Sequence, residues 1–137
     1  MKSLYESILS KSGVGKIYQI QSWLDEYGVE NYTINNKGEI DVDGDVILGG
    51  INLTEFPPFI QFGVVKGLFY CVVCGLTSLK GCPRVVEGDF CCSDNELTTL
   101  KDAPKKVSGN FNCGLNNTQF TKEDVRKVCK VGGKITV

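Results

Sequence analysis

The sequence predicts an α/β solenoid, in which short parallel strands stack coil upon coil between an N-terminal two-helix cap and a C-terminal cap of one helix and one strand. Three observations predict it: a repeat of 21 residues, strand-like alternation of apolar residues inside each repeat, and helix signals before and after the repeats. A fixed period in the 20s is typical of units that bury their apolar edges only against their neighbours. The positions that recur are Gly67, Gly88 and Gly109; Phe69, Phe90 and Phe111; Cys71, Cys92 and Cys113; and Val65, Val86 and Val107.

The N-terminal part, residues 1–43, is expected to hold the two cap helices and a hairpin. Ser3 and Glu6 fit a capping box for a first short helix. A second helix is predicted up to Gly28, because apolar residues follow at a spacing of three to four: Val14, Ile17, Ile20, Trp23 or Leu24, and Tyr27. These helices are expected to cover the open end of the stack. The turn sequences NNKG and DG, set among alternating residues, predict a hairpin over residues 32–42 and a further strand at 45–48.

Residues 44–120 are expected to form the coils, and residues 121–137 the C-terminal cap, all within one cooperative domain. Val46 and Leu48 occupy the positions that Phe69 and Cys71 take one coil later. Thr121 and Asp124 are predicted to cap a helix whose buried stripe is Val125, Val128 and Cys129. The last residues, 134–137, are predicted to add a strand that closes the stack.

One coil carries the pattern F-x-C-x-x-N-x-L-x-x-L, in Phe90, Cys92, Asn95, Leu97 and Leu100. It resembles the leucine-rich repeat, and the proline and valine that follow resemble the short bacterial subtype. The resemblance covers roughly residues 44–120 and implies that Asn95 bonds to the backbone of the adjacent turn. Its replacement by alanine should then cost about 1–3 kcal/mol of stability.

The sequence also resembles short repeat proteins that bacteriophages and prophages encode, particularly those of Bacteroidetes-type hosts. The segment NYTINNKGEIDVDGDVIL, followed by coils of the form LTxLxxxPxxVxGxFxC, carries this resemblance. It implies an origin in a bacterial host cell more than it implies an activity.

Composition favours a binding protein over an enzyme. The chain has no histidine, which removes the commonest general base and metal ligand, and no catalytic constellation stands out. We expect no cofactor. The 137 residues carry no apolar run long enough for a signal peptide or a membrane span, so we expect a cytoplasmic protein with its seven cysteines reduced.

Three chemical alternatives are open. Cys71 and Cys74, with Cys91 and Cys92 nearby, have the spacing of a zinc knuckle, although a ladder of core thiols explains Cys71, Cys92 and Cys113 better. Lys16 follows a glycine-rich stretch, but the first glycine of a phosphate loop and its Ser or Thr are missing. Cys91 should point outward from its strand, and a reactive thiol there is the third alternative.

The residues that flank the buried Phe-x-Cys pairs should face outward from the strands, and several of them are apolar. Acids at alternate positions before the first coil should form a solvated face, a stripe for docking a partner or a cation site. The candidate partner-binding residues are Glu39, Asp41, Asp43, Asp45, Ile47, Leu68, Tyr70, Val72, Asp89, Cys91, Asn110 and Asn112. The alternative is that the caps or a loop cover the apolar part.

The leading hypothesis is a non-catalytic module that binds another macromolecule. Given the phage resemblance, its sharpest form is an anti-CRISPR-like inhibitor of an RNA-guided host nuclease, with the acidic edge in a nucleic-acid channel. A second class is RNA or DNA binding, and a third is a structural or self-associating module of unknown oligomeric state. The candidate nucleic-acid patch is Lys101, Lys105, Lys106, Lys122, Arg126, Lys127 and Lys130.

Overall fold

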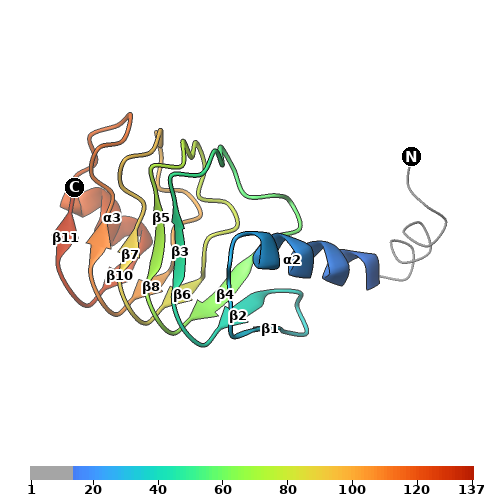
Figure 1. The fold of residues 1–137 in the computed structure, drawn as a ribbon. Helices are drawn as coiled ribbons and strands as arrows, with labels where there is room; N and C mark the ends of the chain where they lie inside the picture. Colours follow the sequence, from blue (N-terminus) through green and yellow to red (C-terminus); the bar gives the residue numbers. More distant parts are fainter. Residues whose placement is uncertain (1–13) are drawn as a thin grey trace.

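The chain winds into a β-solenoid closed at its N-terminal end by a helix (Figure 1). The structure is a computed structural model and describes residues 14–137; the first predicted cap helix lies outside the described residues. Strands on opposite sides of each coil build two sheets. Sheet A has the order β1 (Tyr32–Ile34), β2 (Ile40–Val42), β4 (Phe62–Val65), β6 (Val85–Val86), β8 (Lys106–Val107) and β10 (Lys130–Val131). Sheet B has the order β11 (Ile135–Thr136), β9 (Phe111–Asn112), β7 (Phe90–Cys91), β5 (Phe69–Val72) and β3 (Val46–Gly49).

Sheet B confirms the predicted register. Val46 and Leu48 of β3 pair with Phe69 and Cys71 of β5, and Phe90 in turn pairs with Phe111. All its described pairs are parallel, and the last one joins β11 to β9, so the C-terminal strand closes this sheet as expected.

Sheet A was not predicted as a sheet, because only its hairpin was recognised as strands, and the later members β4, β6, β8 and β10 were not. They are short, and their inward side is a column of valines that pair coil to coil, such as Val65 with Val86 and Val86 with Val107. β-Branched side chains favour extended backbone, and stacking at a constant register supplies the partner for each strand. The predicted hairpin is confirmed as β1 and β2, and β2 also pairs in parallel with β4, so the hairpin is built into the solenoid.

The core between the sheets is a stack of rings and thiols. Phe69, Phe90 and Phe111 are fully buried, with successive ring centroids 5.9 and 5.1 Å apart. Cys71 and Cys92 are equally inaccessible, and Cys113 is nearly so, which confirms that the repeated cysteines belong to the core. The Phe-x-Cys pairs therefore point inward because a strand alternates its side chains between two faces.

Glycines form the corner that leads into sheet B. The amide of Gly88 donates to the carbonyl oxygen of Gly67, and Gly109 donates to Gly88 in the same way. A Cβ atom on Gly88 would lie only 2.7 Å from the carbonyl carbon of Gly67. The 21-residue glycine repeat thus reflects direct backbone contact between coils, which leaves no room for a side chain.

The two caps differ in construction. Helix α2 (Val14–Glu26) buries Ile20, Trp23 and Leu24 against the N-terminal end of the core, where the Trp23 ring lies 6.5 Å from that of Phe62. Ile17, predicted for the same apolar stripe, is 44% exposed instead. At the other end, α3 (Lys122–Val128) begins with the predicted capping box of Thr121 and Asp124. Of its predicted stripe, Val125 and Cys129 are buried and Val128 is half-buried.

Candidate binding surface

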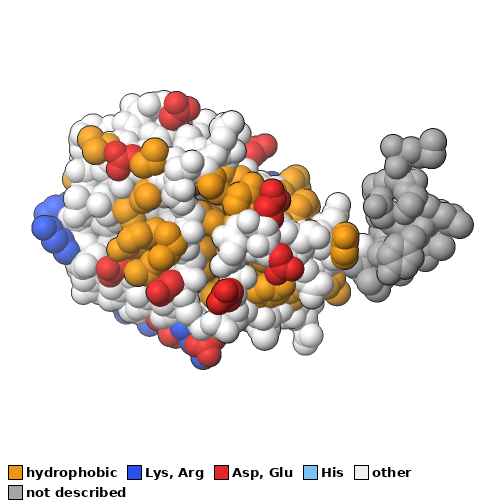
Figure 2. Space-filling model, viewed as in Figure 1, with side chains coloured by type: hydrophobic (Ala, Val, Ile, Leu, Met, Phe, Trp, Pro, Cys, Tyr) orange, Lys and Arg blue, Asp and Glu red, His pale blue; other side chains and the backbone are white. Residues whose placement is uncertain are grey.

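The outward side of sheet B is an apolar surface that the described part of the chain leaves open. Ile47 of β3 is 63% exposed, while Tyr70, Val72 and Cys91 are half-buried on the neighbouring strands. Figure 2 shows hydrophobic side chains gathered over this region of the molecule. The cap α2 covers the end of the core rather than this sheet, as Figure 1 shows. We call the set of Ile47, Leu68, Tyr70, Val72 and Cys91 the apolar face.

A row of residues with left-handed backbone borders the apolar face, one residue per coil. Gly50, Val73, Asp94 and Leu115 follow the strands of sheet B, and all have φ between 54° and 66°. Glycine and aspartate suit this conformation, whereas for valine and leucine it costs roughly 1–2 kcal/mol. Val73 and Leu115 are nevertheless 59% and 78% exposed, so no burial compensates for the cost. We call Val73, Asp94 and Leu115 the left-handed row.

Replacing Val73 by asparagine is therefore expected to stabilise the protein by about 1 kcal/mol, because asparagine adopts left-handed backbone readily. The free energy of unfolding in urea measures the change. Asp94→Val is the matched reverse substitution in the same row and should destabilise by a similar amount. A loss of stability on Val73→Asn would show that the valine makes a favourable contact on the isolated chain.

The predicted acidic stripe does not form, because the structure divides its members between two sheets. Glu39 is buried and paired with Arg84, whose Nε lies 2.6 Å from its carboxylate. Asp41, in sheet A, accepts the amide of Val64 at 2.9 Å. Asp45, at the start of sheet B, accepts the amide of Leu68 at 2.9 Å. Asp43 lies exposed in the bend between the sheets.

Three of the predicted polar contact residues have roles within the stack. Asp89 accepts the amide of Asn110, and Asn110 accepts the amide of Lys134, each from the next coil at 2.8 Å. Asn112 accepts the amide of Gly114. Asp89 and Asn110, like Asp45, hold successive coils in register, whereas Asn112 bonds within its own coil. Their substitution would therefore change stability as well as any binding.

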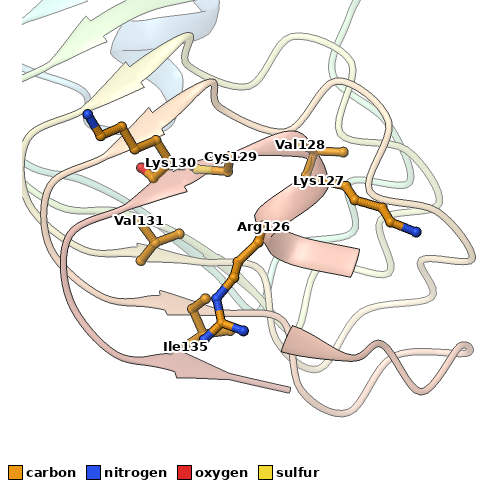
Figure 3. Close-up of a pocket in the computed structure, with 7 residues that line it drawn as sticks. All are labelled: Arg126, Lys127, Val128, Cys129, Lys130, Val131 and Ile135. Carbon is orange, nitrogen blue, oxygen red and sulfur yellow. Dashed lines mark hydrogen bonds between the residues drawn. The ribbon is translucent and has the colours of Figure 1, made fainter. Parts of the chain in front are cut away.

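The predicted basic residues are all exposed and gather on the other side of the solenoid. Lys106 and Lys130 are neighbours on strands β8 and β10 of sheet A. Near them, Arg126, Lys127 and Lys130 line a pocket of about 470 Å³ beside α3. Figure 3 shows these three side chains pointing in different directions, so they form a charged surface and do not converge on one anion.

Charge separates by side of the coil. The fifth strand of sheet B, β11, follows Lys134 at the C-terminal end of the stack. The segments that carry the other four strands of this sheet are residues 43–53, 67–77, 88–98 and 109–119. They contain no lysine or arginine and five acids: Asp43, Asp45, Asp89, Asp94 and Glu96. The segments that carry the return limbs from β4 onward (54–66, 78–87, 99–108 and 120–131) contain ten basic residues and five acidic ones. One side is therefore apolar and acidic, and the other is basic.

The thiols are mostly inaccessible. Six of the seven cysteines are buried, and Cys91 is half-buried with its Sγ 3.3 Å from the Ser93 hydroxyl oxygen. Burial raises the pKa of Cys113 and of Cys129 to about 11, and it also raises the pKa of Cys82 and Cys92. Within residues 14–137, no group of three or more acidic or cysteine side chains is placed to hold a metal ion.

Stability is expected to fall in alkaline solution. The folded-state pKa of Cys113 and Cys129 lies above the ordinary value of 9.0, so their protonated thiols contribute stability that is complete below pH 9 and lost as the pH rises to about 11. Urea unfolding over this range measures the loss. The double variant Cys113→Ala and Cys129→Ala should show a shallower dependence on pH, and an unchanged slope would contradict the assignment.

The sequence located the apolar face but missed the left-handed row. Val73 and Leu115 fall outside the strands, so strand alternation gave no reason to select them. The repeat itself held a signal, because both stand at the position of Asp94, a residue type that favours left-handed backbone.

Comparison of the chain with protein-family models, with curated proteins and with solved structures gave no match in any of the three. Neither described helix combines the length and the apolar character that crossing a bilayer requires.

Proposed function

We propose that this protein is a non-catalytic binding module whose apolar face docks on a partner protein. The observation that carries the proposal is that Ile47 of the apolar face is largely exposed, as are Val73 and Leu115 of the left-handed row that borders it. Contiguous exposed apolar side chains rimmed by polar ones are typical of protein interfaces. The asparagine bonds of Asn95 and Asn116 support the finer assignment of the coils to the leucine-rich-repeat type.

A single charge placed on the apolar face should abolish docking. Ile47→Asp inserts a carboxylate at the most exposed strand residue of the face, where a partner would desolvate it at a cost of several kcal/mol. Thr99→Asp is a matched control on the return side, where the new carboxylate can still accept the Lys101 amide that Thr99 binds. Proteins captured from host-cell extract by the wild type and by Thr99→Asp, but not by Ile47→Asp, would support the proposal. The same set captured by all three, or none by any, would contradict it.

Inhibition of an RNA-guided nuclease remains a prediction within this proposal, together with the phage origin. Of the acids that were expected to enter its nucleic-acid channel, Asp41 lies in sheet A and Glu39 just before it, and both bond within the chain. The apolar face is therefore the better candidate for the first contact with any such partner.

Nucleic-acid binding is the second candidate function, and the separation of charge favours it. Exposed lysines and arginines on the return side could neutralise phosphates without reading sequence. Fluorescence anisotropy with labelled RNA at low salt tests it, and Lys106→Glu with Lys130→Glu should remove the binding. An unchanged anisotropy at low salt would exclude this function.

A further inference from the structure

The left-handed row offers more than exposed apolar surface, because its three residues lie in a fixed order at a fixed spacing. Val73, Asp94 and Leu115 stand on three successive coils, at the same step after strands β5, β7 and β9. Neighbouring strands of a sheet lie about 4.8 Å apart, so Val73 and Leu115 are separated by roughly 9.6 Å with Asp94 between them. All three side chains are exposed.

Stability does not explain the apolar members of this row. Gly50 and Asp94 show which residue types fit the backbone at this position, and Val73 and Leu115 depart from them in the same stack. Both leave their side chains largely in water. Strained backbone clusters at functional sites such as ligand clamps, and contact with a partner is the function that exposed aliphatic side chains can serve.

The charges around the row limit what the partner can be. No lysine or arginine occurs in the segments that carry β3, β5, β7 and β9, and five acids do. Figure 2 shows acidic side chains beside the hydrophobic ones, with the basic ones at the edge and underside of this view. A complementary surface would be aliphatic with a positive charge.

We propose that the left-handed row receives an α-helix of the partner protein that presents one lysine or arginine between two aliphatic side chains. The cation lies over Asp94, and the aliphatic side chains rest on Val73 and Leu115. This inference rests on the proposed docking function and specifies the partner's chemistry.

Spacing favours a helix over an extended segment. In a helix, residues i and i+7 share a face and lie about 10.5 Å apart, with i+3 or i+4 midway between them. In a strand, residues on one face are about 6.6 or 13 Å apart, and neither value fits the row. The helix axis would run across the coils, along the length of the solenoid.

A displayed peptide library tests the inference with the full chain as bait. One arm holds a helical scaffold randomised at i, i+3, i+4 and i+7, and the other holds extended peptides of equal diversity. We expect the wild type to enrich helices with aliphatic residues at i and i+7 and a lysine or arginine between them. Bait carrying Asp94→Lys should enrich aspartate or glutamate at that middle position instead.

Affinity and stability should then change in opposite directions. Val73→Asn and Leu115→Asn should each lower the affinity for the selected peptide by about tenfold or more, as for interface hot spots. The melting temperature of the variant protein should stay the same or rise. Asp94→Asn should lower the affinity less than Asp94→Lys. Circular dichroism on each variant confirms that the fold is retained.

Each other outcome overturns the inference in a distinguishable way. If the selected peptides carried no charge at the middle position, or if that charge did not change sign with the Asp94→Lys bait, the predicted lysine or arginine of the partner would be wrong. Enrichment of extended peptides alone, or of no peptide, would contradict the proposal that the partner segment is a helix. In all these cases the docking function still stands if Ile47→Asp abolishes capture from extract while Thr99→Asp does not.

Discussion

Phe90→Ala is expected to destabilise the protein by about 4 kcal/mol, which is much of the stability of a domain of this size. The Phe90 ring is fully buried and lies between Phe69 and Phe111, at centroid distances of 5.9 and 5.1 Å. Its removal would leave a cavity in the middle of a single stack of coils, where neighbouring backbones are fixed by parallel pairing on both sides. The core could collapse little around such a cavity.

Urea unfolding of the variant and two controls measures this effect. Phe90→Leu retains most of the volume and should cost less than about 1.5 kcal/mol. Phe59→Ala removes a ring that is only partly buried, and its cost should also be clearly smaller. If Phe90→Ala cost no more than Phe59→Ala, the rings would not form the continuous core described above.

The repeat made the inner side of sheet B predictable. Because a glycine, a phenylalanine and a cysteine recur together every 21 residues, successive coils can be aligned in only one register. The burial of Phe90 and Cys92 then follows from the alternation of side chains along a strand. The capping box at Thr121 and Asp124 was equally readable, since both bonds depend only on local spacing.

Sheet A was less predictable because its strands are short and their pairing is wholly non-local. Two residues such as Val85 and Val86 carry too little alternation to distinguish a strand from a loop. Only stacking of successive coils gives them partners. The same reason applies to Glu39, whose pairing with Arg84 joins residues 45 positions apart.

The candidate surface was predictable only in part. Its strand residues follow from alternation, whereas Val73 and Leu115 depend on the backbone conformation after the strand. The separation of charge also needed the fold, because it follows the two sides of each coil, which alternate along the sequence. These features bear most directly on function, so the sequence predicted the scaffold better than its surface.

Asn95→Ala is expected to destabilise the protein by about 3 kcal/mol, at the upper end of the range that the repeat pattern suggested. The Asn95 side chain accepts the amides of Cys74 and Leu76 and donates to the carbonyl oxygens of Cys71, Cys92 and Ser93. It is only 6% exposed. Alanine would leave these backbone groups in two adjacent coils without that partner, in a place that water reaches poorly.

Two neighbouring asparagines calibrate the result in the same urea titration. Asn116 makes the equivalent bonds one coil later, accepting the amide of Leu97 and donating to three carbonyl oxygens, but it is less buried. Its alanine variant should lose less stability, because water can replace part of what is removed. Asn117 is exposed and donates one long bond of 3.5 Å, so Asn117→Ala should be nearly neutral. An order other than Asn95, Asn116, Asn117 would mean that the asparagine ladder does not hold the coils together.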